Sequence, residues 1–116
     1  SVFTHMLPKS VKHYVAEIYR VLEKNGRCLF TAFLINEESK GLIKKGKTSL
    51  NLVHPYQNHF VKNADTPEEA IGYEESTLIN MIRKYNFEIE NLSYGSWPGR
   101  KTYLSYQDLF VIKKKV

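Results

Sequence analysis

A chain of 116 residues suits one small domain, and its 42% hydrophobic content is too high for intrinsic disorder. The formal net charge of +5 is gathered largely in two lysine-rich runs, residues 40–47 and 113–115, which is typical of solvated surface rather than of a nucleic-acid-binding face. The single cysteine, Cys28, excludes an internal disulfide, and the longest apolar run, residues 28–35, is too short to cross a bilayer. We therefore expect a cytoplasmic protein with no membrane partner.

The first predicted elements are a helix and a strand. Apolar residues recur with a 3.6-residue period over residues 8–24, which indicates an amphipathic helix. Gly26 is expected to take the left-handed conformation that ends it. Residues 27–35 follow as a strand, and because this strand is apolar at nearly every position, both of its faces should be covered.

The middle of the chain is predicted to be irregular. Residues 36–65 show no sustained periodicity, and a loop of this length in a small domain is usually functional or mobile. A short helix is predicted to begin at Thr66, where a capping pattern precedes Pro67. Another helix is predicted over residues 75–85, with Asn86 in the left-handed conformation after it.

Two strands complete the predicted domain, at residues 87–94 and 106–113. They are joined without a helix between them, so they should run antiparallel. Trp97 lies in the connection and is expected to pack against this hairpin rather than to stack on a ligand. The order of elements predicts an α/β fold.

The string GLIKKGKT at residues 41–48 matches the pattern of a phosphate-binding loop. Such a loop leaves its strand directly and continues into a helix, whose N-terminus holds the phosphate. Here the strand ends near Ile35, and no helical stripe follows Thr48. The context therefore favours a flexible basic loop, and nucleotide binding remains a minor hypothesis.

Four segments in order resemble the C-terminal half of a class I S-adenosylmethionine-dependent methyltransferase. They are SVFTHM at 1–6, EIYRVLEKNGRCLFTAF at 17–33, YEESTLINMIRKYNFEIENL at 73–92 and SYQDLFVIKK at 105–114. In that family they are similar to the exit of strand four, the helix and strand five, the helix and strand six, and strand seven. At two turns the sequence departs from the family, because Asn25 and Asn86 stand where glycine is usual.

The resemblance implies a partial Rossmann-like three-layer sandwich, made of strands five to seven with the last strand antiparallel and helices on the faces. Residues 1–116 would be the C-terminal part of the domain, with 36–74 as an excursion or lid. The family's glycine-rich loop and ribose-binding acid would lie upstream, so the isolated chain should bind the cofactor weakly and be inactive. The strand at 27–35 would then keep an unpaired edge, which predicts a homo-oligomer or swapped dimer for the isolated chain.

The implied reaction is methyl transfer from S-adenosylmethionine to a small-molecule acceptor. The residues expected beside the cofactor are Ser1, Val2 and Phe3. Met6 would face the substrate, and His54 and Tyr56 would lie over it in the excursion. His5 is the candidate general base, although the favoured interpretation is that it caps the following helix or lines the cleft without transferring a proton. No metal ligand set is expected.

The alternative function is a basic interaction module that binds RNA or an acidic protein, with an affinity that falls steeply with salt. The lysines cluster in loops and are not interleaved with aromatic residues on a strand, which favours the methyltransferase interpretation without nucleic acid as a partner.

Overall fold

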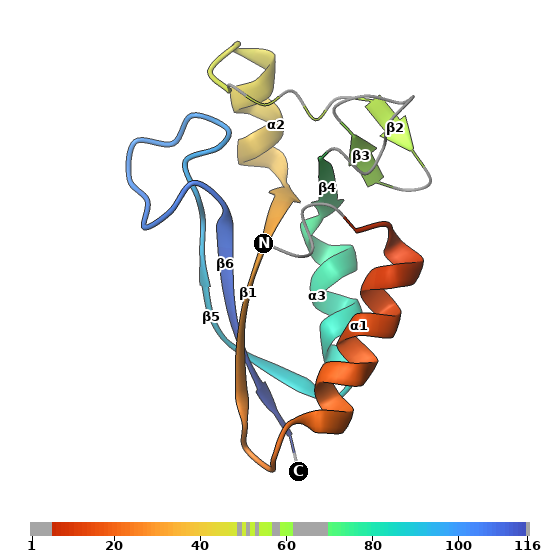
Figure 1. The fold of residues 1–116 in the computed structure, drawn as a ribbon. Helices are drawn as coiled ribbons and strands as arrows, with labels where there is room; N and C mark the ends of the chain where they lie inside the picture. The colour runs from red at the N-terminus through yellow and green to blue at the C-terminus, as the bar shows by residue number, and fades with distance from the viewer. Residues whose placement is uncertain are drawn as a thin grey trace.

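The computed structural model describes residues 6–48, 50, 52, 54–56, 59–61 and 70–115, without the side chains of Pro8, His54, Pro55, Tyr56 and His59. The fold is α/β, as predicted (Figure 1). The elements are α1 (Pro8–Val21), β1 (Arg27–Ile35), α2 (Glu37–Lys44), β2 (His54–Tyr56), β3 (His59–Val61), β4 (Ile71–Glu74), α3 (Glu75–Lys84), β5 (Phe87–Ser93) and β6 (Asp108–Lys114). No helix in these described ranges is both long and apolar enough to span a membrane.

The six strands of the described residues belong to one mixed sheet in the order β2-β3-β4-β1-β6-β5. The strand β6 lies between β1 and β5 and runs antiparallel to both, so β1 and β5 point in the same direction. The predicted antiparallel pairing of the last two strands is therefore confirmed. On its other side β1 pairs in parallel with β4, through residues 33–35 alone.

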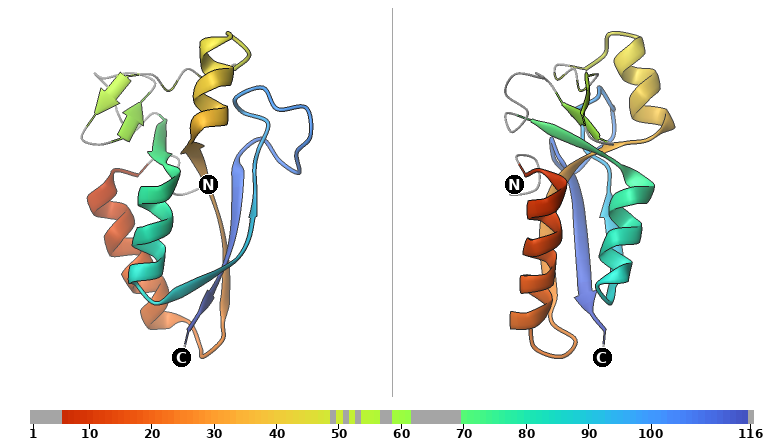
Figure 2. Two further views of the ribbon diagram at one scale, coloured as in Figure 1. Left: turned by 180° about the vertical axis from the view of Figure 1, so that it is seen from behind. Right: turned by 90° about the vertical axis from the view of Figure 1, so that its right-hand side faces the viewer.

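The helices α1 and α3 lie side by side on one face of the sheet (Figures 1 and 2). Side chains alternate along a strand, so Phe30, Ala32 and Leu34 of β1 all point to this face. They join a buried cluster with Val15 of α1 and Ile82 of α3. This cluster is the larger core, and it fixes both helices on the sheet by burial of apolar surface.

A second, smaller core covers the opposite face near the carboxyl end of β1. Phe33 and Ile35 pack there with Leu52, Ala70 and Trp97. The ring of Phe33 meets the Trp97 indole edge-on, with centroids 5.4 Å apart. The prediction that Trp97 is a packing residue is thus confirmed, and the last residues of β1 are covered on both faces.

The first half of β1 is covered on one face only. Leu29 is 64% exposed, and Arg27 beside it reaches across to Glu90 on β5, with Nε–Oε1 at 2.5 Å. Among the described strands, residues 27–32 pair with β6 on one side and with nothing on the other. The expectation that both faces of the whole strand are covered is therefore wrong for this half.

The end of α1 differs from the prediction. The helix stops at Val21 because Leu22 is extended, and the left-handed residue is Asn25, with φ 61°, rather than Gly26. The ammonium group of Lys114 donates to the carbonyl oxygens of Tyr19 and Leu22, at 2.6 and 2.8 Å. A side chain from β6 thus satisfies carbonyls at the helix end, an interaction that the local sequence does not reveal.

The helix α2 replaces the first part of the predicted loop. Asn36 caps it, because its side chain accepts from the Ser39 amide while the Ser39 hydroxyl accepts from the Asn36 amide. The helix has only eight residues and contains Gly41, so its apolar stripe is too short to detect. The GLIKKGKT string is consequently the C-terminal half of a helix and its turn, which is the wrong helix end for phosphate.

The remaining predictions have mixed outcomes. Residues 54–56 and 59–61 belong to the segment predicted to be irregular, but they form the strands β2 and β3, so the prediction is wrong there. Asn86 is left-handed, with φ 68°, at the predicted end of α3. The last strand begins at Asp108 rather than at residue 106, and the short β4 was not predicted. The helix predicted to begin at Thr66 lies outside the described residues.

A methyl group added at Gly95 or at Gly41 should have opposite effects on the free energy of unfolding. A Cβ on Gly95 would stand 2.5 Å from backbone atoms of Gln107, whereas a Cβ on Gly41 would meet nothing within 4 Å. We expect Gly95→Ala to lower the free energy of unfolding by about 1–3 kcal/mol through overpacking. Gly41→Ala should raise it by about 0.5–1 kcal/mol, because alanine favours a helix interior. Urea denaturation measures both, and a Gly95→Ala protein as stable as wild type would contradict the close backbone approach.

Candidate functional site

Most of the predicted cofactor and catalytic residues, Ser1, Val2, Phe3 and His5, lie outside the described residues. Met6 is described and is half buried, and it packs against the larger core. Its carbonyl oxygen accepts a hydrogen bond from the Tyr73 hydroxyl of β4. Since β4 runs parallel to β1, this bond places the start of α1 at the carboxyl ends of the two strands, the edge at which open α/β sheets bind ligands.

The two predicted substrate residues of the excursion, His54 and Tyr56, belong to β2 at the outer edge of the sheet. Their side chains lie outside the described part of the structure. Two strands, β3 and β4, separate β2 from β1. The roles predicted for both residues therefore stay predictions.

A buried carboxylate organises the same end of the sheet. Asp108, the first residue of β6, is fully buried. Its Oδ2 accepts from the Leu34 amide at 2.7 Å and from the Trp97 indole nitrogen at 3.0 Å. Its Oδ1 accepts from the Gly95 amide at 2.6 Å and from Arg100 Nη1 at 3.5 Å. Burial raises the pKa of Asp108, and the four donors offset part of this effect because they favour the ionised form.

Arg100 links this buried carboxylate to the surface. Its side chain is only 8% exposed, and its guanidinium lies over the Tyr94 ring, 4.8 Å from the centroid. Nη1 also donates to the Gly95 carbonyl at 3.0 Å, and Nε donates to Glu38 of α2. Nη2 is buried and has no hydrogen-bond partner among the described residues. Arg100 is thus held firmly while one of its donors stays unused.

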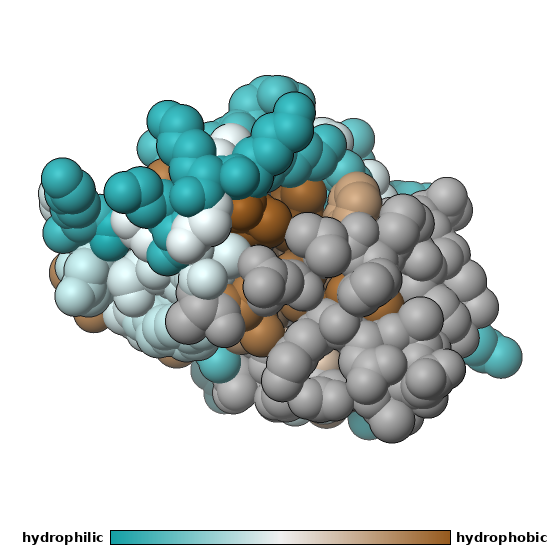
Figure 3. Space-filling model, turned by 90° about the horizontal axis from the view of Figure 1, so that it is seen from above, coloured by the Kyte–Doolittle hydropathy of each residue, from teal (hydrophilic) through white to brown (hydrophobic). Residues whose placement is uncertain are grey.

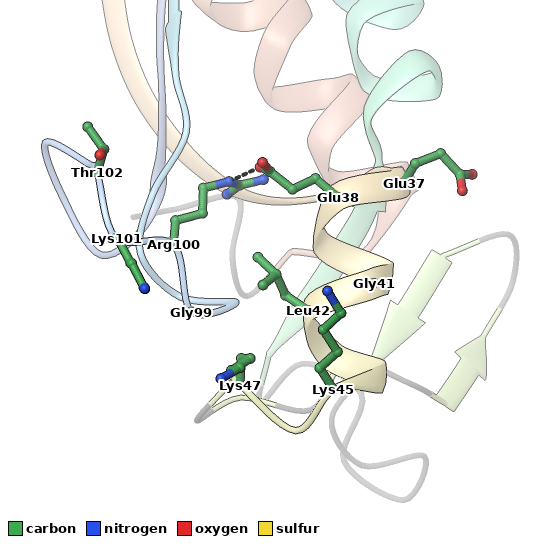
Figure 4. A pocket seen from close by; sticks show the side chains of 10 residues that line it. All are labelled: Glu37, Glu38, Gly41, Leu42, Lys45, Lys47, Gly99, Arg100, Lys101 and Thr102. Atoms are coloured by element: carbon green, nitrogen blue, oxygen red, sulfur yellow. Dashed lines mark hydrogen bonds and ion pairs between the residues drawn. The ribbon is translucent and has the colours of Figure 1, made fainter.

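Beside Arg100 lies an open cleft of about 690 Å³ between α2 and the segment that connects β5 to β6. Its lining residues are Glu37, Glu38, Gly41, Leu42, Lys45, Lys47, Gly99, Arg100, Lys101 and Thr102 (Figure 4). The Thr48 hydroxyl donates to the Trp97 carbonyl at 2.7 Å, which ties the two walls together. Gly99, with φ 107°, lies so close to Lys47 that an added Cβ would stand 2.7 Å from the lysine Cβ. The cleft is therefore built by tertiary contacts rather than by a loose loop.

Basic side chains outnumber acidic ones around the cleft. Lys45, Lys47 and Lys101 contribute three ammonium groups besides the Arg100 guanidinium, whereas Glu37 and Glu38 contribute two carboxylates. Within the described part of the chain, no carboxylate pairs with any of the three lysines. The cleft is therefore electrostatically suited to an anion.

Neither Asp108 nor Arg100 is among the site residues predicted from the sequence. An acidic residue directly before the apolar run LFVI is a weak signal of a buried carboxylate, because unpaired acids are rarely buried. The donors that satisfy Asp108 come from β1, from the connection and from Arg100, so only the fold identifies them.

Other reactive groups offer little. Cys28 is half buried, and burial raises the pKa of its thiol, which disfavours the nucleophilic thiolate. Among the residues with described positions, no group of three His, Cys, Asp or Glu side chains could hold a metal ion. Comparison with known proteins gave no match to any family model and no match to a solved structure.

Replacing Asp108 should be costly. We expect Asp108→Ala to lower the free energy of unfolding by about 3 kcal/mol or more, because four donors and the Arg100 charge lose their acceptor. Asp108→Asn should not restore stability, because either orientation of the amide turns its NH₂ toward two donors. Denaturation followed by fluorescence of the single tryptophan, Trp97, measures both, with Glu88→Gln on the exposed face of β5 as the control. An Asn variant as stable as wild type would show that the second carboxylate oxygen is not needed.

Proposed function

We propose that this chain is the C-terminal part of a methyltransferase domain, and that the complete protein transfers a methyl group from S-adenosylmethionine to a small-molecule acceptor. The observation that supports this most is the unfinished sheet. No strand among the described residues pairs with residues 27–32 of β1 on the side where the resemblance expects strand four. The same half of β1 leaves a face without a helix, as Leu29 shows.

The strand directions agree with the proposed assignment of β1, β5 and β6 to strands five, six and seven. The assignment requires the last strand to be antiparallel, and β6 is antiparallel to both neighbours. The helices that precede β1 and β5 in the chain, α1 and α3, share one face, which leaves the other free for helices from the rest of the domain (Figure 2).

The short strand β4 limits how the missing strand can be added. It occupies the open side of β1 at residues 33–35. A further strand could pair with residues 27–32 of β1 while β4 stays in place. It could also pair with residues 33–35 if β4 moves away from β1. Both arrangements agree with the proposed assignment of strands.

The chemistry would take place at the carboxyl ends of β1 and β4. The view from above shows apolar side chains beside a hydrophilic rim (Figure 3). S-adenosylmethionine supplies an electrophilic methyl group, and the protein has to hold the acceptor in line with it and exclude water. The Tyr73–Met6 hydrogen bond holds Met6, the residue that follows His5 in the sequence, at this edge. The described residues include no glycine-rich loop, so we assign the main cofactor contacts to the rest of the protein.

Cofactor binding tests the proposal. We expect isothermal titration of the isolated 116-residue chain with S-adenosylmethionine to show weak binding or none, because the ribose and methionine contacts are missing. The complete protein should bind the cofactor with micromolar or tighter affinity and methylate an acceptor. Tight binding by the isolated chain would contradict the assignment of strands, and a complete protein that ignores the cofactor would contradict the function.

The isolated chain should self-associate through the uncovered half of β1. A free apolar strand edge recruits another strand, and a second copy is the partner at hand. Leu29→Lys should shift the sedimentation equilibrium toward monomer by placing a charge on this face. Val21→Lys is the matched control, because Val21 on α1 is as exposed, at 66% against 64%. Equal behaviour of the two variants, or a wild-type chain that is monomeric at high concentration, would contradict this association.

A further inference from the structure

We infer that the cleft between α2 and residues 95–102 binds the oxyanion of a small molecule, a phosphate or a carboxylate, on the Nε–Nη2 edge of Arg100. The inference concerns residues of this chain alone and does not depend on the proposed methyl transfer. It is argued from the hydrogen bonds of the guanidinium and from the charges that surround it.

The described residues form three arginine–glutamate pairs, and two of these pairs share one geometry. In the Arg20–Glu17 pair, Nε and Nη2 bind the two carboxylate oxygens at 2.9 and 3.3 Å. In the Arg27–Glu90 pair the same two nitrogens bind the two oxygens at 2.5 and 3.2 Å. This bidentate arrangement is the strongest one that a guanidinium makes with an oxyanion.

Arg100 departs from this arrangement. Its Nε binds Glu38, but the neighbouring Nη2 on the same edge has no partner among the described residues. The other amino group, Nη1, is already committed to Gly95 and Asp108. An unsatisfied buried donor beside a charged one is costly, so the edge is underused in this state. An oxyanion with two available oxygens would satisfy both nitrogens.

Glu38 occupies this edge of Arg100 through its hydrogen bond to Nε. Its side chain is 62% exposed, so it can turn into solvent at little cost, whereas Arg100 is fixed by Asp108 and Tyr94. Glu38 thus acts as a weak internal competitor for the position that a ligand would take. Figure 4 shows the two side chains meeting at the cleft, with Glu37 on the other side of α2.

Three lysines line the cleft besides Arg100. Lys45, the C-cap of α2, and Lys101 across from it flank the gap, and Lys47 lies between the turn after α2 and Gly99 (Figure 4). Lysine ammonium groups supply attraction without a fixed geometry, whereas arginine supplies the directional fork. One fixed guanidinium and three mobile ammonium groups match a compact anion of charge about −2, such as a phosphate ester or a dicarboxylate.

Two glutamates that neighbour each other in the chain provide a sharp test. Glu37→Gln and Glu38→Gln each remove one negative charge from the first turn of α2 and from the lining of the cleft. Only Glu38 competes for Arg100. We expect Glu38→Gln to tighten binding of inorganic phosphate about tenfold, and Glu37→Gln to change it less than about twofold.

Binding is followed by NMR titration of the isolated chain with inorganic phosphate and, separately, with succinate. The Arg100 Nε–H and Gly99 amide signals should shift saturably with at least one anion, and the stronger anion identifies the ligand as a phosphate or a carboxylate. Lys45→Ala should weaken the binding at least threefold, whereas Lys44→Ala, which does not line the cleft, should leave it unchanged. Linear shifts with both anions, or equal effects of the two glutamine variants, would overturn the inference.

Discussion

The structure around the carboxyl end of β1 depends on one interaction, the buried carboxylate of Asp108 with its four hydrogen-bond donors. Its two oxygens collect donors from β1, from the connection between β5 and β6, and from two side chains of that connection. A buried acid is tolerated only when it is satisfied in this way. The carboxylate therefore fixes a connection that has no helix or strand of its own, and it does so at the edge of the sheet where a ligand would bind.

The second core and the cleft follow from this arrangement. Once Trp97 is held by its indole hydrogen bond, it fills the space over Phe33 and Ile35. The same connection then presents Arg100 to α2, with the guanidinium supported from below by Asp108. Packing and charge are thus coupled, because the group that secures the core also positions the basic residue of the cleft.

The first half of β1, residues 27–32, is less well covered. Helices cover one of its faces, and among the described strands only β6 pairs with it. On the other face Leu29 and the Arg27–Glu90 pair are exposed to solvent. The strand β1 is therefore covered on both faces at its carboxyl end and on one face only at its start. The proposed methyltransferase domain explains the difference, since the missing strand and helices would cover this half.

The sequence by itself determined the elements whose signals are local. The period of α1, the apolar run of β1, the helix α3 ended by left-handed Asn86 and the final antiparallel pair could all be predicted from spacing and turn residues. Tertiary structure decided the rest. The helix α1 ends at Val21, where Lys114 from β6 donates to the carbonyls of the helix end, and α2 forms although its apolar stripe is too short to detect. The Asp108–Arg100 site joins residues from separate elements, and hydrogen bonds between distant residues leave no periodic trace in the chain.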